Sequence, residues 1–159
     1  MQKSPDVFTK RAFLSRTGGL LLSRQSVLPH PQLHIINRTK KYIPQTLLRV
    51  IFRYASKKNT MEVSVVFLGD ETMRKLNMRY RGKNKPANVL AFPLTAHTGE
   101  ICVNPVAAKR ETRSRHISYY KMITYLFLHG LLHLYGFSHT TPHSSRRMEQ
   151  AETLLMNKV

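Results

Sequence analysis

The sequence has little cysteine and no long apolar run. Cys102 is the only cysteine among 159 residues, so no disulfide can form within the chain and no disulfide partner is expected. Cys102 lies between Ile101 and Val103, which is typical of a core residue, whereas a reactive thiol requires an electropositive and partly exposed setting. The best apolar run, residues 122–134, is shorter than the roughly 18 residues of a membrane span and predicts a buried helix, so no membrane-spanning segment is expected and a membrane is not the favoured partner.

Acidic residues are also scarce. The chain has 8 acidic against 26 basic residues and a formal net charge of +18. Such a charge favours polyanionic partners, because each neutralised phosphate releases condensed counterions. Nucleic acid is therefore the first partner to consider. A basic surface that only maintains solubility, or one that binds a membrane surface, remains an alternative, since charge alone does not distinguish them.

The length fits a single domain preceded by a tail. We expect residues 1–30 to form a flexible basic arm and residues 31–159 to form the domain. The arm is rich in arginine and poor in acids, as organelle transit peptides are, which leaves a mitochondrial or plastid location open. Gly18-Gly19 and the lack of helical periodicity weaken that alternative, so we expect a cytoplasmic protein.

Apolar periodicity after residue 31 alternates between strand and helix, which indicates an α/β fold. Strands are predicted at 33–36, 62–68, 88–93 and 100–104, and helices at 44–54, 70–80, 105–115, 118–134 and 144–156. Asp70 is expected to cap its helix, and Leu154 is expected on the apolar face of the last one.

Three histidines near the C-terminus have the spacing of metal ligands. His129 and His133 are one helical turn apart and project from the same face. Gly136 ends the helix and lets the chain fold back, so that His139 can provide a third imidazole. Three histidines leave one tetrahedral position for water, as in a catalytic zinc site, and we expect one Zn²⁺ per chain. The alternative is that the helical pair are core residues bonded to backbone carbonyls.

The same spacing matches the ligand frame of metzincin proteases. In those enzymes the residue after the first histidine is a glutamate that acts as general base. Here that residue is Gly130, so the frame is present without the proton acceptor of a peptidase. A protease is therefore disfavoured.

The segment 129–139, with its three histidines, Gly130, Gly136 and Phe137, resembles the signature of the YbeY family of ribosomal RNA maturation endoribonucleases. Residues 76–93 and the triplet Gly99-Glu100-Ile101 resemble two further blocks of that family, so the similarity covers about residues 33–156. The resemblance implies a small mixed four-stranded sheet covered by helices, with a zincin-like metal-site helix.

The resemblance also implies a function. It implies a single-strand-specific, metal-dependent endoribonuclease in ribosomal RNA maturation, at the 3′ end of the small-subunit RNA, and in ribosome quality control. The expected partners are ribosomal RNA and the small ribosomal subunit, and the oligomeric state is left open. The alternatives are a non-catalytic, RNA-binding ribosome assembly factor with a structural metal and, less favoured, a zinc metalloprotease.

The resemblance assigns a catalytic role to Arg81, whose guanidinium would stabilise charge on a phosphodiester. Arg79, Lys83 and Lys85 extend this positive strip and are expected to bind substrate. On the residues alone, Arg81 and Lys83 fit a solvated turn equally well.

Some residues near these motifs depart from the family or lack a clear role. Ser138 stands where the family usually has aspartate, which is expected to change how His139 is oriented. Glu149 and Glu152 are interpreted as surface acids, or as general bases if the last helix folds over the metal. The remaining histidines are interpreted as surface or loop residues; they are His30, His34, His97, His116 and His143.

Overall fold

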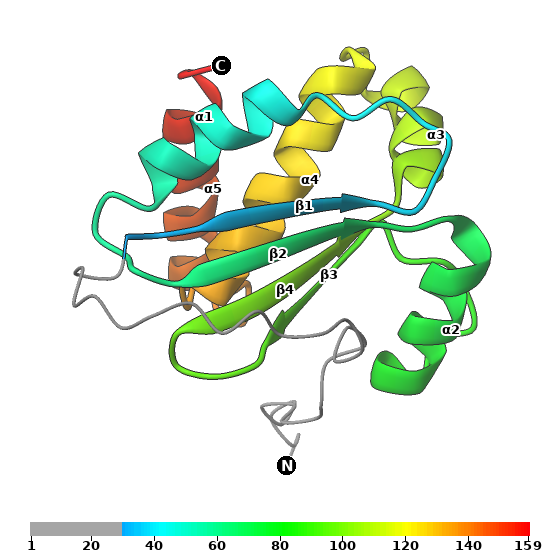
Figure 1. Cartoon of the computed structure of the whole chain (residues 1–159), viewed down its shortest axis with the longest axis horizontal. Helices are drawn as coiled ribbons and strands as arrows, with labels where there is room; N and C mark the ends of the chain where they lie inside the picture. The colour runs from blue at the N-terminus through cyan, green and yellow to red at the C-terminus, as the bar shows by residue number, and fades with distance from the viewer. Residues whose placement is uncertain (1–29) are drawn as a thin grey trace, which may run out of the picture.

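The computed structural model describes residues 30–159, which form a four-stranded sheet with helices on both faces (Figure 1). The elements in chain order are β1 (Leu33–Asn37), α1 (Gln45–Ala55), β2 (Glu62–Phe67), α2 (Asp70–Arg81), β3 (Val89–Pro93), β4 (Thr98–Val103), α3 (Pro105–Arg115), α4 (Tyr119–Leu134) and α5 (Pro142–Met156). The predicted α/β fold class is confirmed, and every predicted strand and helix is present. The predicted basic arm lies outside the described residues except for His30, so it stays a prediction.

The sheet is mixed, with the strand order β1-β2-β4-β3. β1 and β4 each pair with β2 in parallel, and β3 pairs with β4 antiparallel at one edge. A short loop joins β3 to β4, as hairpin partners allow, whereas each parallel pair is joined through a helix. The predicted small mixed sheet is therefore confirmed.

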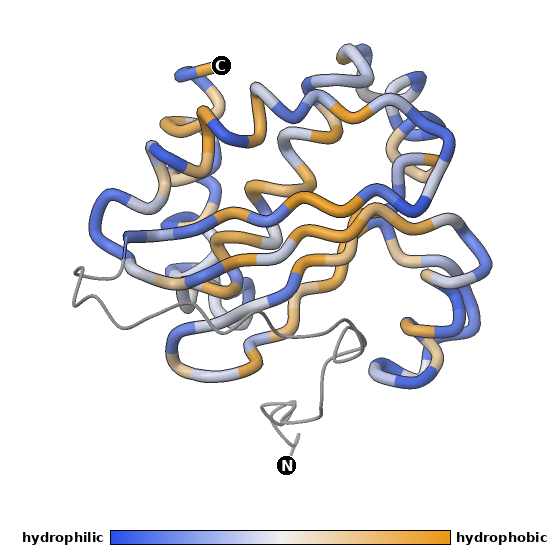
Figure 2. Tube along the Cα trace, in the orientation of Figure 1, coloured by the Kyte–Doolittle hydropathy of each residue, from blue (hydrophilic) through white to orange (hydrophobic). Residues whose placement is uncertain are grey.

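The two faces of the sheet are covered unequally. Val63, Val65 and Ile101 belong to the larger core, which includes residues of α1, α4 and α5. The opposite face carries Cys102 in a smaller core with Met73 of α2. Figure 1 shows α1, α4 and α5 on one side of the strands and α2 on the other, and Figure 2 shows the hydrophobic residues concentrated along the strands and α4.

Helix α4 is the central helix of the larger core and carries the histidine pair. The Ser118 side chain caps it by accepting a hydrogen bond from the Lys121 N–H at 3.2 Å. Most of its residues after the first turn are buried, including Phe127 and Leu131 at 0% exposure. This packing fixes the position of α4 over the sheet, so that the side chains at its C-terminal end have defined directions.

Two predictions about individual residues are wrong. Asp70 does not cap α2, because Gly69 is the N-cap residue and the Asp70 carboxylate instead accepts hydrogen bonds from Arg110 and Asn104. Leu154 is 67% exposed and does not belong to the apolar face of α5, where Met148 is buried. The cap prediction failed because Asp70 is bound by residues distant in the sequence, and the structure gives no such partner for Leu154 within residues 30–159.

Within residues 30–159, no helix is long and apolar enough to cross a membrane. The predicted cytoplasmic location stays a prediction.

Candidate metal centre

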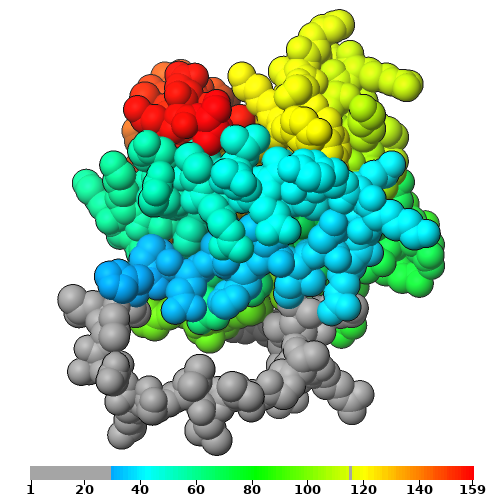
Figure 3. All heavy atoms as spheres, turned by 45° about the horizontal axis from the view of Figure 1, so that its top comes forward, coloured from blue at the N-terminus to red at the C-terminus, as the bar shows by residue number. Residues whose placement is uncertain are grey.

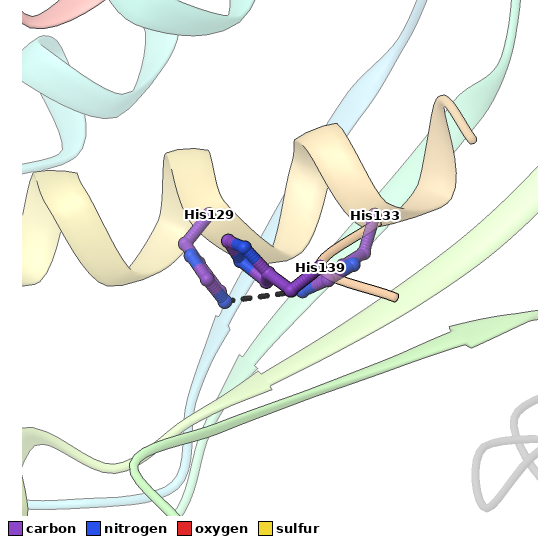
Figure 4. A group of neighbouring side chains, drawn as sticks. All are labelled: His129, His133 and His139. Atoms are coloured by element: carbon purple, nitrogen blue, oxygen red, sulfur yellow. Dashed lines mark hydrogen bonds between the residues drawn. The ribbon is translucent and has the colours of Figure 1, made fainter. Parts of the chain in front are cut away.

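The three predicted ligands lie together at the C-terminal end of α4. His129 and His133 are on successive turns of α4, and His139 comes from the segment that follows it (Figure 4). Each of the three offers one ligand atom, and these atoms all lie within 4.8 Å of one another. The ring centroid of His139 is 5.3 Å from that of His129 and 5.4 Å from that of His133.

The turn after α4 brings His139 back. Gly136 has a φ of 86°, in the left-handed region that favours glycine. Its N–H donates to the His133 carbonyl at 3.1 Å, and the Phe137 N–H donates to the Leu132 carbonyl at 3.0 Å. These two bonds satisfy the last carbonyls of the helix and reverse the chain, as the sequence predicted from Gly136.

The imidazole of His129 is oriented by α5. Its Nδ1 lies 2.7 Å from Oε1 of Glu152, whose side chain is only 10% exposed. The second carboxylate oxygen of Glu152 accepts a hydrogen bond from the Tyr125 hydroxyl at 3.4 Å. A carboxylate can only accept here, so Nδ1 of His129 carries the proton and Nε2 is left as a lone pair.

The imidazole of His133 is oriented by the backbone of the turn. Its Nδ1 lies 3.0 Å from the Phe137 carbonyl oxygen. Because a carbonyl oxygen can only accept, Nδ1 carries the proton, and Nε2 of the neutral ring has a free lone pair. Burial lowers the pKa of His133 below its usual value, and the neighbouring His129 lowers it further. Both effects favour the neutral imidazole that a metal requires.

The arrangement fits a metal ion better than it fits an interhistidine hydrogen bond. Nε2 of His133 lies 3.1 Å from Nε2 of His129, as the dashed line in Figure 4 marks. Because both Nδ1 atoms already carry a proton, a hydrogen bond between the Nε2 atoms would require one ring to become a cation. Two nitrogens bound at about 2.0–2.1 Å to one tetrahedral zinc would be about 3.3 Å apart. The residues present therefore fit a zinc-sized divalent cation.

The centre is accessible from one side. His129 and His133 are partly buried, whereas His139 is exposed. In the same segment as His139, the ring of Phe137 has its centroid 5.9 Å from the guanidinium carbon of Arg147. An exposed third ligand is compatible with a substrate reaching the metal, which a closed structural site would not allow.

Gly130 faces the sheet. A Cβ built on it would lie 2.7 Å from Cγ2 of Ile101 and 3.1 Å from Cγ2 of Val89. A side chain there would have to displace the side chains of Ile101 and Val89, so the packing disfavours a protease glutamate at this position.

The basic strip around Arg81 lies apart from the histidines. Arg81 is the last residue of α2, which packs on the face of the sheet opposite α4. Arg81, Lys83 and Lys85 are exposed, and the exposed Arg79 has its guanidinium 5.7 Å from the Tyr80 ring centroid. Among residues 30–159, no hydrogen bond, ion pair or ring contact joins Arg81 to the three histidines. The strip is exposed as expected, and its role in catalysis stays a prediction.

The loop that carries Lys83 and Lys85 is held by a buried side chain. Asn77 is 2% exposed, and its Nδ2 donates to the Lys85 carbonyl at 2.7 Å. Gly82, with a φ of 66°, ends α2 and turns the chain into this loop. The strip is therefore presented on a fixed turn.

The remaining candidates behave as surface or core residues. Cys102 is buried, and burial raises the pKa of its thiol, so it is not a reactive thiolate. The Ser138 hydroxyl lies 3.1 Å from that of Thr140, its only hydrogen bond seen within residues 30–159. The other histidines are exposed; they are His30, His34, His97, His116 and His143.

Glu152 is the site residue that sequence reasoning placed wrongly. It is buried against His129, whereas Glu149, on the same helix, is exposed as expected. The interpretation of Glu152 as a surface acid is therefore wrong. The signal that could have identified it is its position on an apolar face of α5, four residues after Met148, which is fully buried.

Comparisons with known proteins agree with this geometry. Residues 30–159 match the model of the family described as endoribonuclease YbeY. The chain is 37% identical over 106 residues to endoribonuclease YbeY of Chelativorans sp., which covers 61% of this chain and 65% of that protein. It is 30% identical over 127 residues to that of Bartonella henselae, with 74% of this chain and 80% of that protein covered.

A solved structure has the same fold. The solution structure of TM1509 from Thermotoga maritima matches with a TM-score of 0.61 and 25% identity, over 80% of this chain and 88% of that one. The family model covers the whole of the described domain, including both the histidine segment and the basic strip. The chain belongs to the endoribonuclease YbeY family.

Proposed function

We propose that the chain is a metal-dependent endoribonuclease that cleaves single-stranded ribosomal RNA during its maturation. The observation that carries the proposal is the convergence of three imidazole side chains. Glu152 and the Phe137 carbonyl each accept from the Nδ1 of one histidine, so the Nε2 atoms of His129 and His133 have lone pairs free for a metal. Family membership supports RNA cleavage, and the net charge of +18 supports a polyanionic substrate.

Zinc is the metal we propose. Imidazole ligands suit zinc, copper, nickel and iron, and a three-histidine set with an accessible side is typical of catalytic zinc. A divalent cation held there supplies Lewis-acid chemistry at neutral pH. His129 and His133 hold the metal with their Nε2 atoms, Glu152 fixes the tautomer of His129, and His139 completes the set from the exposed side.

The basic strip is proposed to hold the substrate. Arg81 is proposed to stabilise negative charge on the phosphodiester, with Arg79, Lys83 and Lys85 contacting flanking phosphates. Because Arg81 ends α2 and the histidines lie on and just after α4, which cover opposite faces of the sheet, this role requires the RNA to contact both helices. The 3′ end of small-subunit RNA, ribosome quality control, the small ribosomal subunit as partner and a cytoplasmic location are the corresponding biological proposals.

The test compares His133→Ala with His143→Ala, a matched control because His143 is exposed on α5 and outside the cluster. Both variants and the wild type are purified as full chains, and metal content and cleavage of single-stranded and duplex ribosomal RNA are measured. We expect His133→Ala to lose metal and cleavage, and His143→Ala to keep both. Equal cleavage by His133→Ala and the wild type would contradict a metal-dependent nuclease.

A ribosome assembly factor with a purely structural metal gives a different result. In that case wild-type protein binds RNA and metal but leaves the RNA intact under every metal tested. The exposure of His139 favours the enzyme, since a structural site is closed to solvent ligands.

A further inference from the structure

Two tyrosines form an exposed aromatic pair far from the metal centre. Tyr42, in the loop between β1 and α1, is 68% exposed, and Tyr120, in the first turn of α4, is 49% exposed. Their ring centroids are 5.6 Å apart, at an interplanar angle of 72°. Figure 3 shows the segment before α1 (cyan) meeting the start of α4 (yellow) at the surface. Large apolar side chains in this position leave ring surface available to a ligand.

The loop that presents Tyr42 is held in place by both its ends. The Tyr42 carbonyl accepts a hydrogen bond from the Tyr119 hydroxyl at 3.1 Å, and the next residue, Ile43, is buried. On the other side, the Asn37 side chain donates to the Lys41 carbonyl at 2.9 Å and accepts from the Thr39 N–H at 2.9 Å. The ring is therefore pre-organised, and a ligand that stacks on it orders little of the backbone.

The surroundings of the pair are positive. Lys40, Lys41 and Lys121 are exposed beside the two rings in the sequence. In the sequence, the acid nearest to Tyr120 is Glu111, nine residues before it, and the acid nearest to Tyr42 is Glu62, 20 residues after it. Lysines are therefore the nearest charged neighbours of both tyrosines in the sequence, with no acid beside them, which is the composition of a phosphate-binding surface.

We infer that Tyr42 and Tyr120, together with Lys40, Lys41 and Lys121, bind an unpaired nucleotide of an RNA strand. The base stacks on a tyrosine ring, and the lysines contact the adjacent phosphates. This is the combination by which proteins hold single strands without reading their sequence. The inference rests on the proposed function, because it assigns a second contact to the same RNA substrate. We call these five residues the tyrosine–lysine surface.

RNA fits this surface better than a protein partner does. Protein interfaces are enriched in tyrosine but depleted in lysine at their centre, and here each tyrosine has an exposed lysine directly beside it in the sequence. The surface is also not a subsite of the metal centre. Tyr120 precedes His129 by nine residues, about 14 Å along the axis of α4 and about half a turn round it. The surface is therefore expected to change RNA affinity and KM, with kcat unaffected.

The experiment uses the zinc-loaded full chain. Binding of a fluorescein-labelled, 2′-O-methylated single-stranded RNA is measured by fluorescence anisotropy, and cleavage of the unmodified RNA gives kcat and KM. For the double variant Tyr42→Ala/Tyr120→Ala we expect an affinity loss on the order of ten-fold, with KM raised and kcat unchanged. For Tyr42→Phe/Tyr120→Phe we expect affinity within about two-fold of wild type, because the ring faces remain.

Two further variants separate stacking, charge and general surface effects. Leu154→Ala removes an equally exposed apolar side chain on α5, 67% exposed, and should leave affinity unchanged. The triple variant Lys40→Gln/Lys41→Gln/Lys121→Gln should bind RNA with a weaker salt dependence. The slope of log affinity against log salt concentration should become less steep by up to about 2, because each phosphate contact on a single strand contributes about 0.7. Circular dichroism of every variant accompanies the binding measurements.

Three outcomes would overturn the inference. Wild-type affinity in the double alanine variant would exclude RNA stacking and leave the surface to a protein partner. An equal loss in the phenylalanine and alanine variants would exclude stacking as the source of affinity. If either result is found while the wild type cleaves RNA normally, only the inference about the tyrosine–lysine surface is refuted. A wild-type protein that neither binds nor cleaves RNA would refute the proposed function as well.

Discussion

The buried carboxylate of Glu152 is expected to set the metal affinity of the histidine centre. It accepts from Nδ1 of His129 at 2.7 Å and thereby holds Nε2 as the lone pair that a metal needs. Outer carboxylate partners of this kind typically change metal affinity by about 10- to 100-fold, equivalent to about 1.4–2.7 kcal/mol. We therefore expect Glu152→Ala to weaken zinc binding within that range.

The amide variant separates hydrogen bonding from charge. In Glu152→Gln the side-chain oxygen can still accept from Nδ1, so the tautomer is kept while the negative charge is lost. We expect its zinc affinity to lie between those of the wild type and Glu152→Ala. Glu149→Ala is the matched control, because Glu149 is exposed on the same helix and should leave the affinity unchanged.

Competition with a chromophoric chelator at fixed pH gives the zinc dissociation constant of each variant. Thermal unfolding of the metal-free proteins checks that a change in affinity does not come from loss of the fold. If Glu152→Ala and Glu149→Ala bind zinc equally tightly, the orientation of His129 by α5 does not contribute to metal binding and the reasoning fails.

Three further predictions concern stability. Two hydrogen bonds from Arg110, with a further one from Asn104, lower the pKa of the Asp70 carboxyl. The ion pair between Asp70 and Arg110 therefore stabilises the fold above about pH 4, and this stabilisation is lost as the pH falls through the lowered pKa. Since both side chains are more than a third exposed, Arg110→Ala should cost only about 0.2–1 kcal/mol in urea unfolding at pH 7, and less at pH 3. Burial raises the pKa of Glu100, so the contribution of this one group to stability is present below about pH 4 and is lost as the pH rises through the raised pKa. Glu100→Gln should therefore raise the melting temperature at pH 8 but not at pH 4, and parallel pH profiles of the two proteins would contradict this. Gly130→Ala places a Cβ 2.7 Å from Cγ2 of Ile101. This contact should lower the free energy of unfolding by about 1–3 kcal/mol, partly offset by about 1 kcal/mol of gained helix propensity. An unchanged urea midpoint would exclude the close packing.

The sequence predicted the elements well because the signals are local. The apolar pattern of α4, the pair His129 and His133 on one face, and the turn at Gly136 each depend on residues within a few positions of one another. The proximity of His139 to His129 and His133 could be predicted from the same short segment. The order of the strands did not follow from the pattern of residues, because β4 inserts between β2 and β3 through contacts that are distant in sequence.

Long-range partners account for the errors at Asp70 and Glu152. Asp70 is 40 residues from Arg110, and that ion pair, with the Asn104 contact, takes the carboxylate away from the N-terminus of α2. Glu152 is 23 residues from His129, and only the packing of α5 on α4 brings the two together. Both are acids whose partners cannot be identified from neighbouring residues, so a preference for solvent was the default interpretation.

Neither Gly130 nor Glu152 provides the general base of a peptidase mechanism. Gly130 stands where a protease has its general base, and a Cβ there would meet the side chains of Ile101 and Val89, so a glutamate would have to displace them. Glu152 does reach the centre, but it contacts His129 through Nδ1, on the opposite side of the ring from the Nε2 lone pair. Its carboxylate therefore orients a ligand and is not placed to take a proton from a group at the metal. The histidine frame is thus kept by the turn at Gly136, while the packing of α4 on Ile101 and Val89 disfavours the glutamate that a protease has after its first histidine.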